Sequence, residues 1–281
     1  MTENKSQTGQ AACFPCPLCG ESSVVSFRAF VLRKYDVAYG LCEACGLLAT
    51  EPPHWLDEAY RSPIGVADTG LVARNLANAS LAASVCRLLG VANGTLVDVA
   101  GGYGLFTRLM RDSGFDCYTH DPLCTNVHAL GFEPPAGCRS EMIFAFEAIE
   151  HIRTPLEFLE NAFRTYGCRT ALVSTQTFSG FPPPQTWWYY SFDGGQHVML
   201  YQPRSVGVLA EKLKCRCYSL SPAHHLITDR TLHAATKLVL RSSVLRRFYS
   251  AIHRRLVPLQ SKTFADSGLG SLVRGRKGTG G

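Results

Sequence analysis

The chain has 281 residues, of which 46% are hydrophobic and 18% charged, which describes a globular protein with one large domain and a smaller appendage. No stretch approaches the ~20 consecutive apolar residues that span a bilayer, and the polar first ten residues lack the apolar segment of a secretory signal, so we expect a cytoplasmic protein. The net charge of +6 is concentrated near the end, where residues 227–281 carry eleven Lys/Arg and two Asp, which excludes a uniformly basic nucleic-acid binder.

Residues 12–50 hold a cysteine cluster around two short β-like runs, at 23–30 and 37–42. Two Cys-x2-Cys pairs, each followed by glycine, are separated by 22 residues. Two such knuckles supply four thiolates in a tetrahedron, which leaves no open position for a substrate. We therefore predict a zinc ribbon that holds a structural Zn²⁺, and the alternative is four unrelated free thiols. The predicted ligands are Cys16, Cys19, Cys42 and Cys45.

Residues 1–11 are expected to be a disordered N-terminus, and residues 51–94 a linker with a leading helix. Leu71, Leu81, Val85 and Leu88 recur at roughly helical spacing. The two glycines at positions 90 and 94 end this helix.

Residues 95–225 alternate short apolar strands with helical stretches. The predicted strands cover 95–101, 116–121, 141–146 and 170–175, and helices are predicted from about Leu105 and Pro155. Such alternation is typical of a parallel sheet covered by helices. The sequence therefore predicts an α/β fold for this part of the chain.

A glycine-rich loop follows the first of these strands. Asp98 ends the strand, and Gly101, Gly102 and Gly104 precede the helix, so bare backbone can turn sharply and approach a ligand. The dinucleotide-binding fingerprint fails, because its sixth position, counted from Gly102, is Thr107. The pattern of an acid followed by small-x-Gly-x-Gly instead resembles motif I of class I S-adenosylmethionine-dependent methyltransferases. The alternative is a purely structural turn.

The resemblance implies a Rossmann-like methyltransferase sheet with S-adenosyl-L-methionine as cofactor, whose methionine part the glycine loop receives. The next strand ends at Asp121, seventeen residues past Gly104, where an acid can bind both ribose hydroxyls. Many relatives contact the adenine after the third strand, a role for which Asn126 and Glu133 are the candidates here. The implied cofactor-binding residues are Asp98, Ala100, Gly101, Gly102, Tyr103, Gly104 and Asp121.

The stretch after the strand at 141–146 reads Glu-x-x-Glu-His-x-x-x-Pro, formed by Glu147, Glu150, His151 and Pro155. Methyltransferases of the ubiquinone type often carry this pattern, and a helix with proline in its first turn fits it. With the cysteine pairs and a later Gly-Gln-His, residues 12–225 are similar to zinc-ribbon methyltransferases among sugar- and capsule-modifying enzymes. In that family this motif borders the cofactor.

Residues 187–200, here called the aromatic loop, combine four consecutive aromatic residues with two glycines and a histidine. The resemblance implies that this loop lies over the active site. Aromatic faces there would suit flat rings or the apolar face of a sugar, and Gly194 and Gly195 would let the loop close. The alternative is that the rings fill the core above the sheet. The expected substrate-binding residues are Trp187, Trp188, Tyr189 and Tyr190.

His197, with His151 near it, is the candidate catalytic base, because a neutral histidine can align and deprotonate a hydroxyl at about pH 7. A second divalent cation is the other option. Some small-RNA 2′-O-methyltransferases and ubiquinone-pathway O-methyltransferases bind one through an ExxEH motif and a downstream histidine. The alternative to a catalytic or metal-binding role, for both histidines, is a purely structural hydrogen bond. The residues that match are Glu147, Glu150, His151 and His197.

Residues 226–281 are predicted to form a basic helical tail with a Gly-rich, disordered end. Apolar and arginine side chains alternate between residues 231 and 256. Such a helix either packs on the domain with a solvated basic edge, lies on an anionic membrane face as a peripheral contact, or binds RNA.

The sequence as a whole predicts a methyltransferase that moves a methyl group from S-adenosyl-L-methionine to a hydroxyl of a saccharide or another small acceptor. One alternative is an RNA methyltransferase that binds RNA through the ribbon and the tail. The zero net charge of residues 11–50 disfavours this alternative. The other alternative is a non-catalytic binding protein with the same fold. The methyl acceptor and the oligomeric state stay open.

Overall fold

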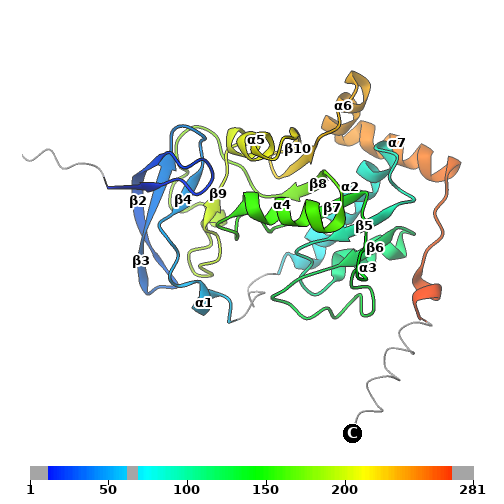
Figure 1. The fold of residues 1–281 in the computed structure, drawn as a ribbon, viewed down its shortest axis with the longest axis horizontal. Coiled ribbons are helices and arrows are strands. Elements are labelled where there is room, and N and C mark those ends of the chain that lie inside the picture. Colours follow the sequence, from blue (N-terminus) through cyan, green and yellow to red (C-terminus); the bar gives the residue numbers. More distant parts are fainter. Residues whose placement is uncertain (1–11, 62–68, 268–281) are drawn as a thin grey trace, which may run out of the picture.

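The computed structural model describes residues 12–61 and 69–267, which form two β-sheets and their covering helices (Figure 1). The disorder expected for residues 1–11 and for the end of the tail concerns segments outside the described residues. Among the described residues, no helix has both the length and the apolar character needed to cross a membrane.

The larger sheet, here called the central sheet, has six strands in the order β10-β11-β8-β7-β5-β6. Neighbouring strands from β8 to β6 are parallel, whereas β11 is antiparallel to both of its neighbours. Every residue of β7 and β8 is buried, as expected for parallel strands covered on both faces. The strands are β5 (Thr95–Asp98), β6 (Asp116–Thr119), β7 (Met142–Ala145), β8 (Thr170–Ser174), β10 (Arg216–Ser221) and β11 (His224–Thr228).

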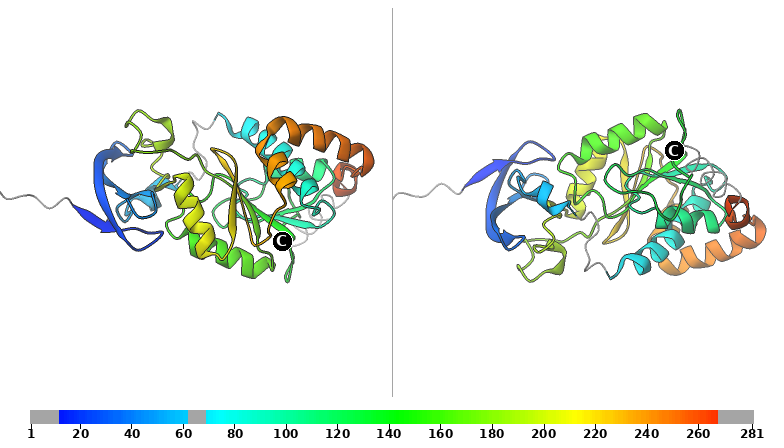
Figure 2. Two further views of the ribbon diagram at one scale, coloured as in Figure 1. Left: turned by 90° about the horizontal axis from the view of Figure 1, so that it is seen from above. Right: turned by 90° about the horizontal axis from the view of Figure 1, so that it is seen from below.

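Alternate residues of the central strands face opposite helical layers, because successive side chains of a strand point to opposite faces. Phe144 and Leu172 pack in one core with α2 and α3, whereas Ile143 and Val173 pack in another with α4 and α5. Figure 2 shows these two layers on opposite sides of the sheet. The helices expected from Leu71, from Leu105 and from Pro155 are confirmed. The helices are α1 (Leu56–Ala59), α2 (Leu71–Leu88), α3 (Leu105–Asp112), α4 (Pro155–Tyr166), α5 (Pro203–Lys212), α6 (Ala234–Arg241) and α7 (Ser243–Leu256).

The smaller sheet, here called the ribbon sheet, is antiparallel and has the order β1-β2-β3-β4-β9. Its last strand comes from far along the chain, because Leu48 pairs with Leu200 and Ala49 with Met199. The ribbon expected at residues 12–50 therefore takes one of its strands from the aromatic loop. The strands are β1 (Cys13–Pro15), β2 (Ser22–Val31), β3 (Tyr35–Cys42), β4 (Leu48–Thr50) and β9 (Met199–Leu200).

One domain boundary differs from the sequence prediction. The tail expected from residue 226 begins later, because β11 continues to Thr228 as part of the central sheet. Residues 120–141 contain neither a helix nor a strand, so β6 stays at the edge of the central sheet. The two candidate adenine contacts, Asn126 and Glu133, therefore lie in a segment without regular secondary structure.

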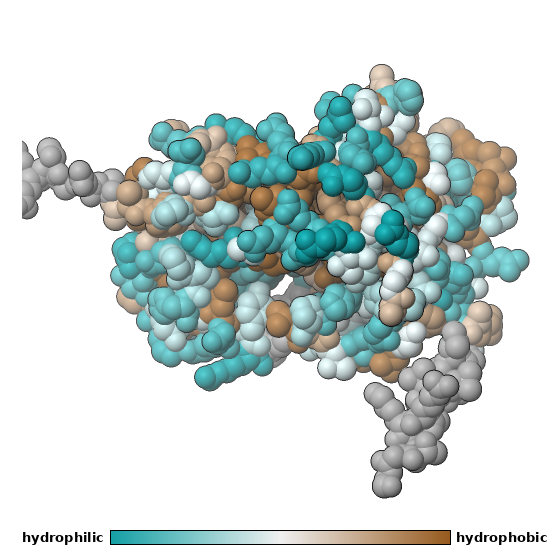
Figure 3. All heavy atoms as spheres, in the orientation of Figure 1, coloured by the Kyte–Doolittle hydropathy of each residue, from teal (hydrophilic) through white to brown (hydrophobic). Residues whose placement is uncertain are grey.

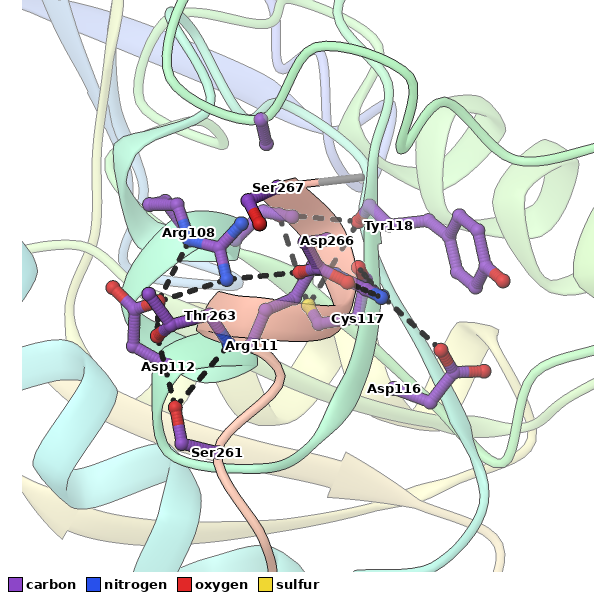
Figure 4. Close-up of polar contacts among 12 residues, drawn as sticks. Arg108, Arg111, Asp112, Asp116, Cys117, Tyr118, Ser261, Thr263, Asp266 and Ser267 are labelled. Carbon is purple, nitrogen blue, oxygen red and sulfur yellow. Dashed lines mark hydrogen bonds and ion pairs between the residues drawn. The ribbon is translucent and has the colours of Figure 1, made fainter. Parts of the chain in front are cut away.

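The end of the described chain folds back onto α3. Leu259 lies against Gly114, and the carboxylate of Asp266 sits between Arg108 and Arg111 at 2.9 and 2.8 Å (Figure 4). Asp266 is buried, and its two guanidinium partners lower the pKa of the carboxyl even though burial acts in the opposite direction. This contact anchors the tail to the helix that follows the glycine loop.

Candidate active site

A cavity of about 810 Å³ opens at the carboxyl ends of β5 and β7. From β5 the chain passes through α3 to β6 on one side and then crosses to β7 on the other. Ligands of open α/β sheets bind at such a reversal of strand order. The cavity is lined by the glycine loop, the start of α2, the aromatic loop and residues near α1, together with Phe146, Glu147 and His151.

The glycine loop needs glycine at the predicted positions. Gly102 and Gly104 have φ of 53° and 81°, in the left-handed region that side chains disfavour. A Cβ on Gly101 would lie 2.0 Å from the Thr119 hydroxyl oxygen. The loop therefore presents bare backbone to the cavity, which Ala100 and Tyr103 also line.

The carboxylate of Asp121 accepts hydrogen bonds from the glycine loop and from the segment after β6. One carboxylate oxygen accepts the N–H of Gly102 at 2.9 Å, and the other accepts the N–H groups of Leu123 and Cys124. Asp121 itself is not among the residues that line the cavity. Each carboxylate oxygen offers two lone-pair sites, so the group keeps acceptor capacity for a ligand hydroxyl.

Asp98 is the buried acid of the site. Its side chain is 2% exposed, and one of its oxygens has no hydrogen-bond partner. Burial, followed by the charge of Asp121, raises the pKa of Asp98 to about 8. An acid that faces a cavity without a partner suits a ligand that brings a positive charge or a donor.

The two candidate adenine contacts are engaged with each other. The Asn126 amide donates to Glu133 at 2.7 Å and to the carbonyl of Ala129 at 2.6 Å. Its oxygen accepts the N–H of Ala129. Neither residue lines the cavity, so both brace the loop after β6 and we do not assign them to adenine.

The four consecutive aromatic residues separate into two pairs. Trp188 and Tyr189 line the cavity, and Trp188 is 74% exposed. Trp187 and Tyr190 lie outside the lining and pack edge to face, with 5.2 Å between their ring centroids. Tyr190 also packs face to face with Phe192. Only two of the four rings that were expected to wall a pocket therefore line the cavity, since Tyr190 is buried and Trp187 packs half-buried against the core beneath the loop.

Tyr189 holds His197 in place. The Nδ1 atom of His197 donates to the carbonyl oxygen of Tyr189 at 2.6 Å, because a carbonyl can only accept. The Tyr189 hydroxyl in turn donates to Glu150 at 2.7 Å and accepts the N–H of Gln176. Burial lowers the pKa of His197 to about 4, so the ring is neutral with an unprotonated Nε2.

Three of the four residues expected around a second cation gather at one point. Ligand atoms of Glu150, His151 and His197 lie within 4.8 Å of one another. Glu147 is outside this group, since its carboxylate accepts from the hydroxyl of Ser174 at 2.5 Å. Burial, and then His197, lower the pKa of His151 to about 3, and burial raises that of Glu150 well above its usual value.

The cysteine cluster has the geometry of a metal site. Cys16 and Cys45 place their sulfurs 3.6 Å apart, and Cys19 and Cys42 place theirs 3.4 Å apart. All four sulfurs lie within 4.8 Å of one another. Sulfurs at the corners of a tetrahedron around zinc are about 3.8 Å apart, since the Zn–S bond is about 2.3 Å. The spacing of the four thiols is therefore compatible with a zinc ion.

Sequence reasoning missed the contribution of α2. Leu71, Asn75 and Asn78 line the cavity, and their spacing of four and three residues puts them on one helix face. Asn78 is buried and accepts from Nε2 of His224 at 2.9 Å. The available signal was the pair of amides on the apolar face of the predicted helix.

Comparisons with known proteins agree with this architecture. A family model described as "Methyltransferase domain" matches residues 72–220, which is more than half of the chain. No curated protein matches the sequence.

Among solved structures, an O-methyltransferase family protein from Burkholderia thailandensis shares 16% identity, with 63% of this chain and 67% of that chain covered and a TM-score of 0.43. The 1,6-didemethyltoxoflavin-N1-methyltransferase of Burkholderia thailandensis shares 14% identity over 72% of this chain and 97% of that chain, with a TM-score of 0.42. A methyltransferase in calicheamicin biosynthesis shares 12% identity over 53% of this chain and 54%, about half, of that chain, with a TM-score of 0.36. On the family match, the chain belongs to the methyltransferase domain family and carries its α/β, Rossmann-like fold.

Proposed function

We propose that the chain is an S-adenosylmethionine-dependent methyltransferase that methylates a hydroxyl of a small acceptor, with a saccharide as the favoured class. One observation carries the proposal: a single cavity is lined both by the glycine loop and by a histidine whose tautomer is fixed by Tyr189. A cofactor site and a proton acceptor therefore share one space at the carboxyl ends of the central strands.

The glycine loop and the two acids hold the cofactor in this proposal. When bound, S-adenosylmethionine supplies an electrophilic methyl carbon on a sulfonium. Gly101 and Gly102 line the cavity with backbone that carries no side chain, and the unpartnered oxygen of Asp98 offers a negative charge to the cationic end of the cofactor. Asp121 lies behind the cavity lining, but its carboxylate is bonded to the N–H of Gly102, which lines the cavity, and it accepts the ribose hydroxyls in this proposal.

His197 removes the proton from the acceptor hydroxyl. Its Nδ1 hydrogen is committed to the Tyr189 carbonyl, so Nε2 is the acceptor atom. The low pKa keeps Nε2 unprotonated at neutral pH. Tyr189 acts as a positioning residue, because its hydroxyl is itself held by Glu150 at 2.7 Å.

The acceptor lies between the aromatic loop and α2. Trp188 is 74% exposed and offers a ring face. The lining also contains the amide side chains of Asn75 and Gln196, which donate to the carbonyls of Leu71 and Ala59. Ring faces combined with amide donors and acceptors suit a saccharide, which has apolar faces and hydroxyl edges. This combination is the support for the acceptor class.

The proposal is tested by incubating the purified protein with labelled S-adenosylmethionine and a panel of nucleotide-sugars, glycans and RNA. We expect label on a saccharide, and a His197→Ala variant to lose about 10²–10⁴-fold in rate while binding S-adenosylhomocysteine as the parent does. Added imidazole should restore part of the rate. The control is His233→Ala, which changes an exposed histidine at the start of α6. A His197→Ala variant as fast as its parent would exclude the base role.

A divalent cation held by Glu150, His151 and His197 is the second candidate for activating the acceptor. It is favoured by two buried atoms without hydrogen-bond partners, Oε2 of Glu150 and Nδ1 of His151. Carboxylate and imidazole ligands suit Mn²⁺, Fe²⁺ or Zn²⁺, which would polarise a bound hydroxyl. Chelators also strip zinc, so the test is a titration with Mg²⁺ and Mn²⁺ at constant zinc content. Activity that needs an added ion, and that Glu150→Gln abolishes, would favour the cation over the free base.

We also propose that the cysteine cluster holds one structural Zn²⁺. The support is the distance between its sulfurs and the burial of Cys16, Cys42 and Cys45. Four protein ligands leave no open coordination position, so this ion contributes folding free energy rather than catalysis. Elemental analysis should find one zinc per chain.

A further inference from the structure

Helix α7 turns its apolar face to solvent, whereas a usual surface helix turns that face to the core. Helix α7 lies against α2, and its less exposed side chains are polar. The Tyr249 hydroxyl donates to the Arg87 carbonyl at 3.5 Å. The apolar side chains of α7 point away from the domain. The residues that are buried or half-buried are Arg246, Tyr249, Ser250 and His253, and the exposed apolar residues are Val244, Leu245, Phe248, Ile252 and Leu256.

The exposed apolar residues form one continuous strip, here called the α7 strip. At 100° per residue, the five side chains fall within an arc of about 120° on the helix. Phe248 and Leu256 are 66% and 75% exposed, so none of the described residues covers the strip. Figure 3 shows hydrophobic surface over α7 at the upper right of the molecule. Leu238 of the preceding α6 is exposed as well.

The charge around the strip is entirely positive. Residues 230–265 contain eight Lys/Arg and no Asp or Glu. Arg247 and Arg254 lie along one edge of the strip, Arg255 lies within it, and all three are exposed. An apolar strip bordered by cations is the pattern of a helix that lies in a membrane interface, with its apolar side chains below the headgroups.

We propose that α7 docks the protein on an anionic membrane surface. A second copy of the chain fits less well, because a twofold contact through the α7 strip would place arginines of one copy beside arginines of the other. An anionic lipid surface satisfies both features at once: acyl chains receive the apolar side chains, and headgroup phosphates receive the guanidinium groups. The proposal is independent of the methyl acceptor.

The test is co-sedimentation of the full-length chain with two kinds of vesicle. One contains only phosphatidylcholine, and the other contains about one quarter phosphatidylglycerol. We expect binding to the anionic vesicles to exceed binding to the neutral ones by at least about tenfold, and to weaken as salt is raised.

Matched variants separate the apolar strip from simple charge attraction. Phe248→Ser/Ile252→Ser should lower the affinity for anionic vesicles by at least about tenfold. Its control is Phe30→Ser on β2, which removes a phenylalanine of the same 66% exposure elsewhere. Arg247→Glu/Arg254→Glu should abolish binding to the anionic vesicles. Its control is Arg164→Glu/Lys212→Glu, an equal charge change at exposed positions of α4 and α5.

Several results would overturn the proposal. They are no binding to anionic vesicles, equal binding by Phe248→Ser/Ile252→Ser and its parent, or loss of binding only in the arginine variant, which would indicate simple anion attraction. Sedimentation that shows a dimer in the parent and a monomer in Phe248→Ser/Ile252→Ser would assign the α7 strip to a second copy instead. Thermal unfolding of each variant verifies that the fold is intact.

Discussion

The two sheets of this protein are held together by different means. Central strands such as β7 and β8 are buried at every residue between two helical layers, so their stability comes from apolar burial on both faces. In strand β2 of the ribbon sheet, exposed residues instead alternate with buried or half-buried ones, and four thiols gather at one end of that sheet. In our proposal, a zinc ion at these thiols stabilises the ribbon sheet, whereas apolar burial alone accounts for the central strands.

The ribbon nevertheless holds one side of the active site. The Trp55 indole donates to the carbonyl of Gly195 at 2.8 Å, and the N–H of Leu32 donates to Phe192. Thr50 donates to Val198, the residue after His197. The glycine loop, in contrast, is built on β5 and α3 of the central sheet. The proposed cofactor site and the proposed base are therefore supported by different sheets, and variants can disrupt them separately.

The largest effect is expected from the cysteine cluster. Cys42→Ser removes one of four thiolates at a buried position, and structural zinc sites contribute about 10–16 kcal/mol of binding free energy in zinc-finger peptides. We expect loss of zinc and a fall in methyl transfer of at least about 10³-fold, while S-adenosylhomocysteine still binds. Elemental analysis, rate assays and calorimetry measure the three quantities. The control is Cys217→Ser, a half-buried cysteine in β10. A zinc-free variant with parental activity would refute the link between ribbon and site.

The second prediction concerns the glycine loop and the substitution Gly101→Ala. The new Cβ would lie 2.0 Å from the Thr119 hydroxyl oxygen and 2.8 Å from an Asp98 oxygen, so the glycine loop must move. We expect cofactor affinity to fall by about 100-fold, which is about 2.7 kcal/mol, with zinc content unchanged. Gly207→Ala is the control, since a Cβ there meets no atom within 4 Å. Calorimetry that gives both variants the parental Kd would contradict the assignment of the loop.

A smaller effect is expected where Trp55 contacts the aromatic loop. Trp55→Phe leaves the carbonyl of Gly195 without its buried donor, which costs about 1–3 kcal/mol. Methyl transfer should fall about tenfold because the aromatic loop loosens around His197, whereas cofactor affinity should stay constant. Tyr190→Phe is the comparison, because it removes a hydroxyl from the same loop whose bond goes to Pro183 rather than to the ribbon. Equal activity losses in the two variants would show that any bond of this loop matters as much.

The smallest effect concerns pH. Asp98 has a pKa of about 8 in the empty protein, so much of it is protonated at neutral pH, whereas a cationic ligand favours its charged form. Binding below pH 8 therefore releases a proton, and the affinity for S-adenosylmethionine should rise with pH, by about tenfold between pH 7 and pH 9, and then level. Calorimetry across this range measures it. Asp98→Asn should bind with a flat profile, and a slope that survives in that variant would point to another group.

Features that depend on local spacing followed from the amino-acid sequence by itself. The two cysteine pairs gather as predicted because each knuckle needs only two intervening residues and a turn. The glycine loop and the helices from Leu105 and Pro155 likewise follow from residues that are neighbours in the chain. Alternating strands and helices were sufficient for the fold class.

Only the tertiary structure decided which side chains share a surface. Leu48 meets Leu200 in one sheet, and Tyr189 faces the cavity while its neighbour Tyr190 does not. Amphipathic spacing identified the helix α7 but not its orientation, with the apolar strip in solvent. Periodicity tells which residues share a face of an element, whereas the direction of that face depends on packing partners far away in the chain.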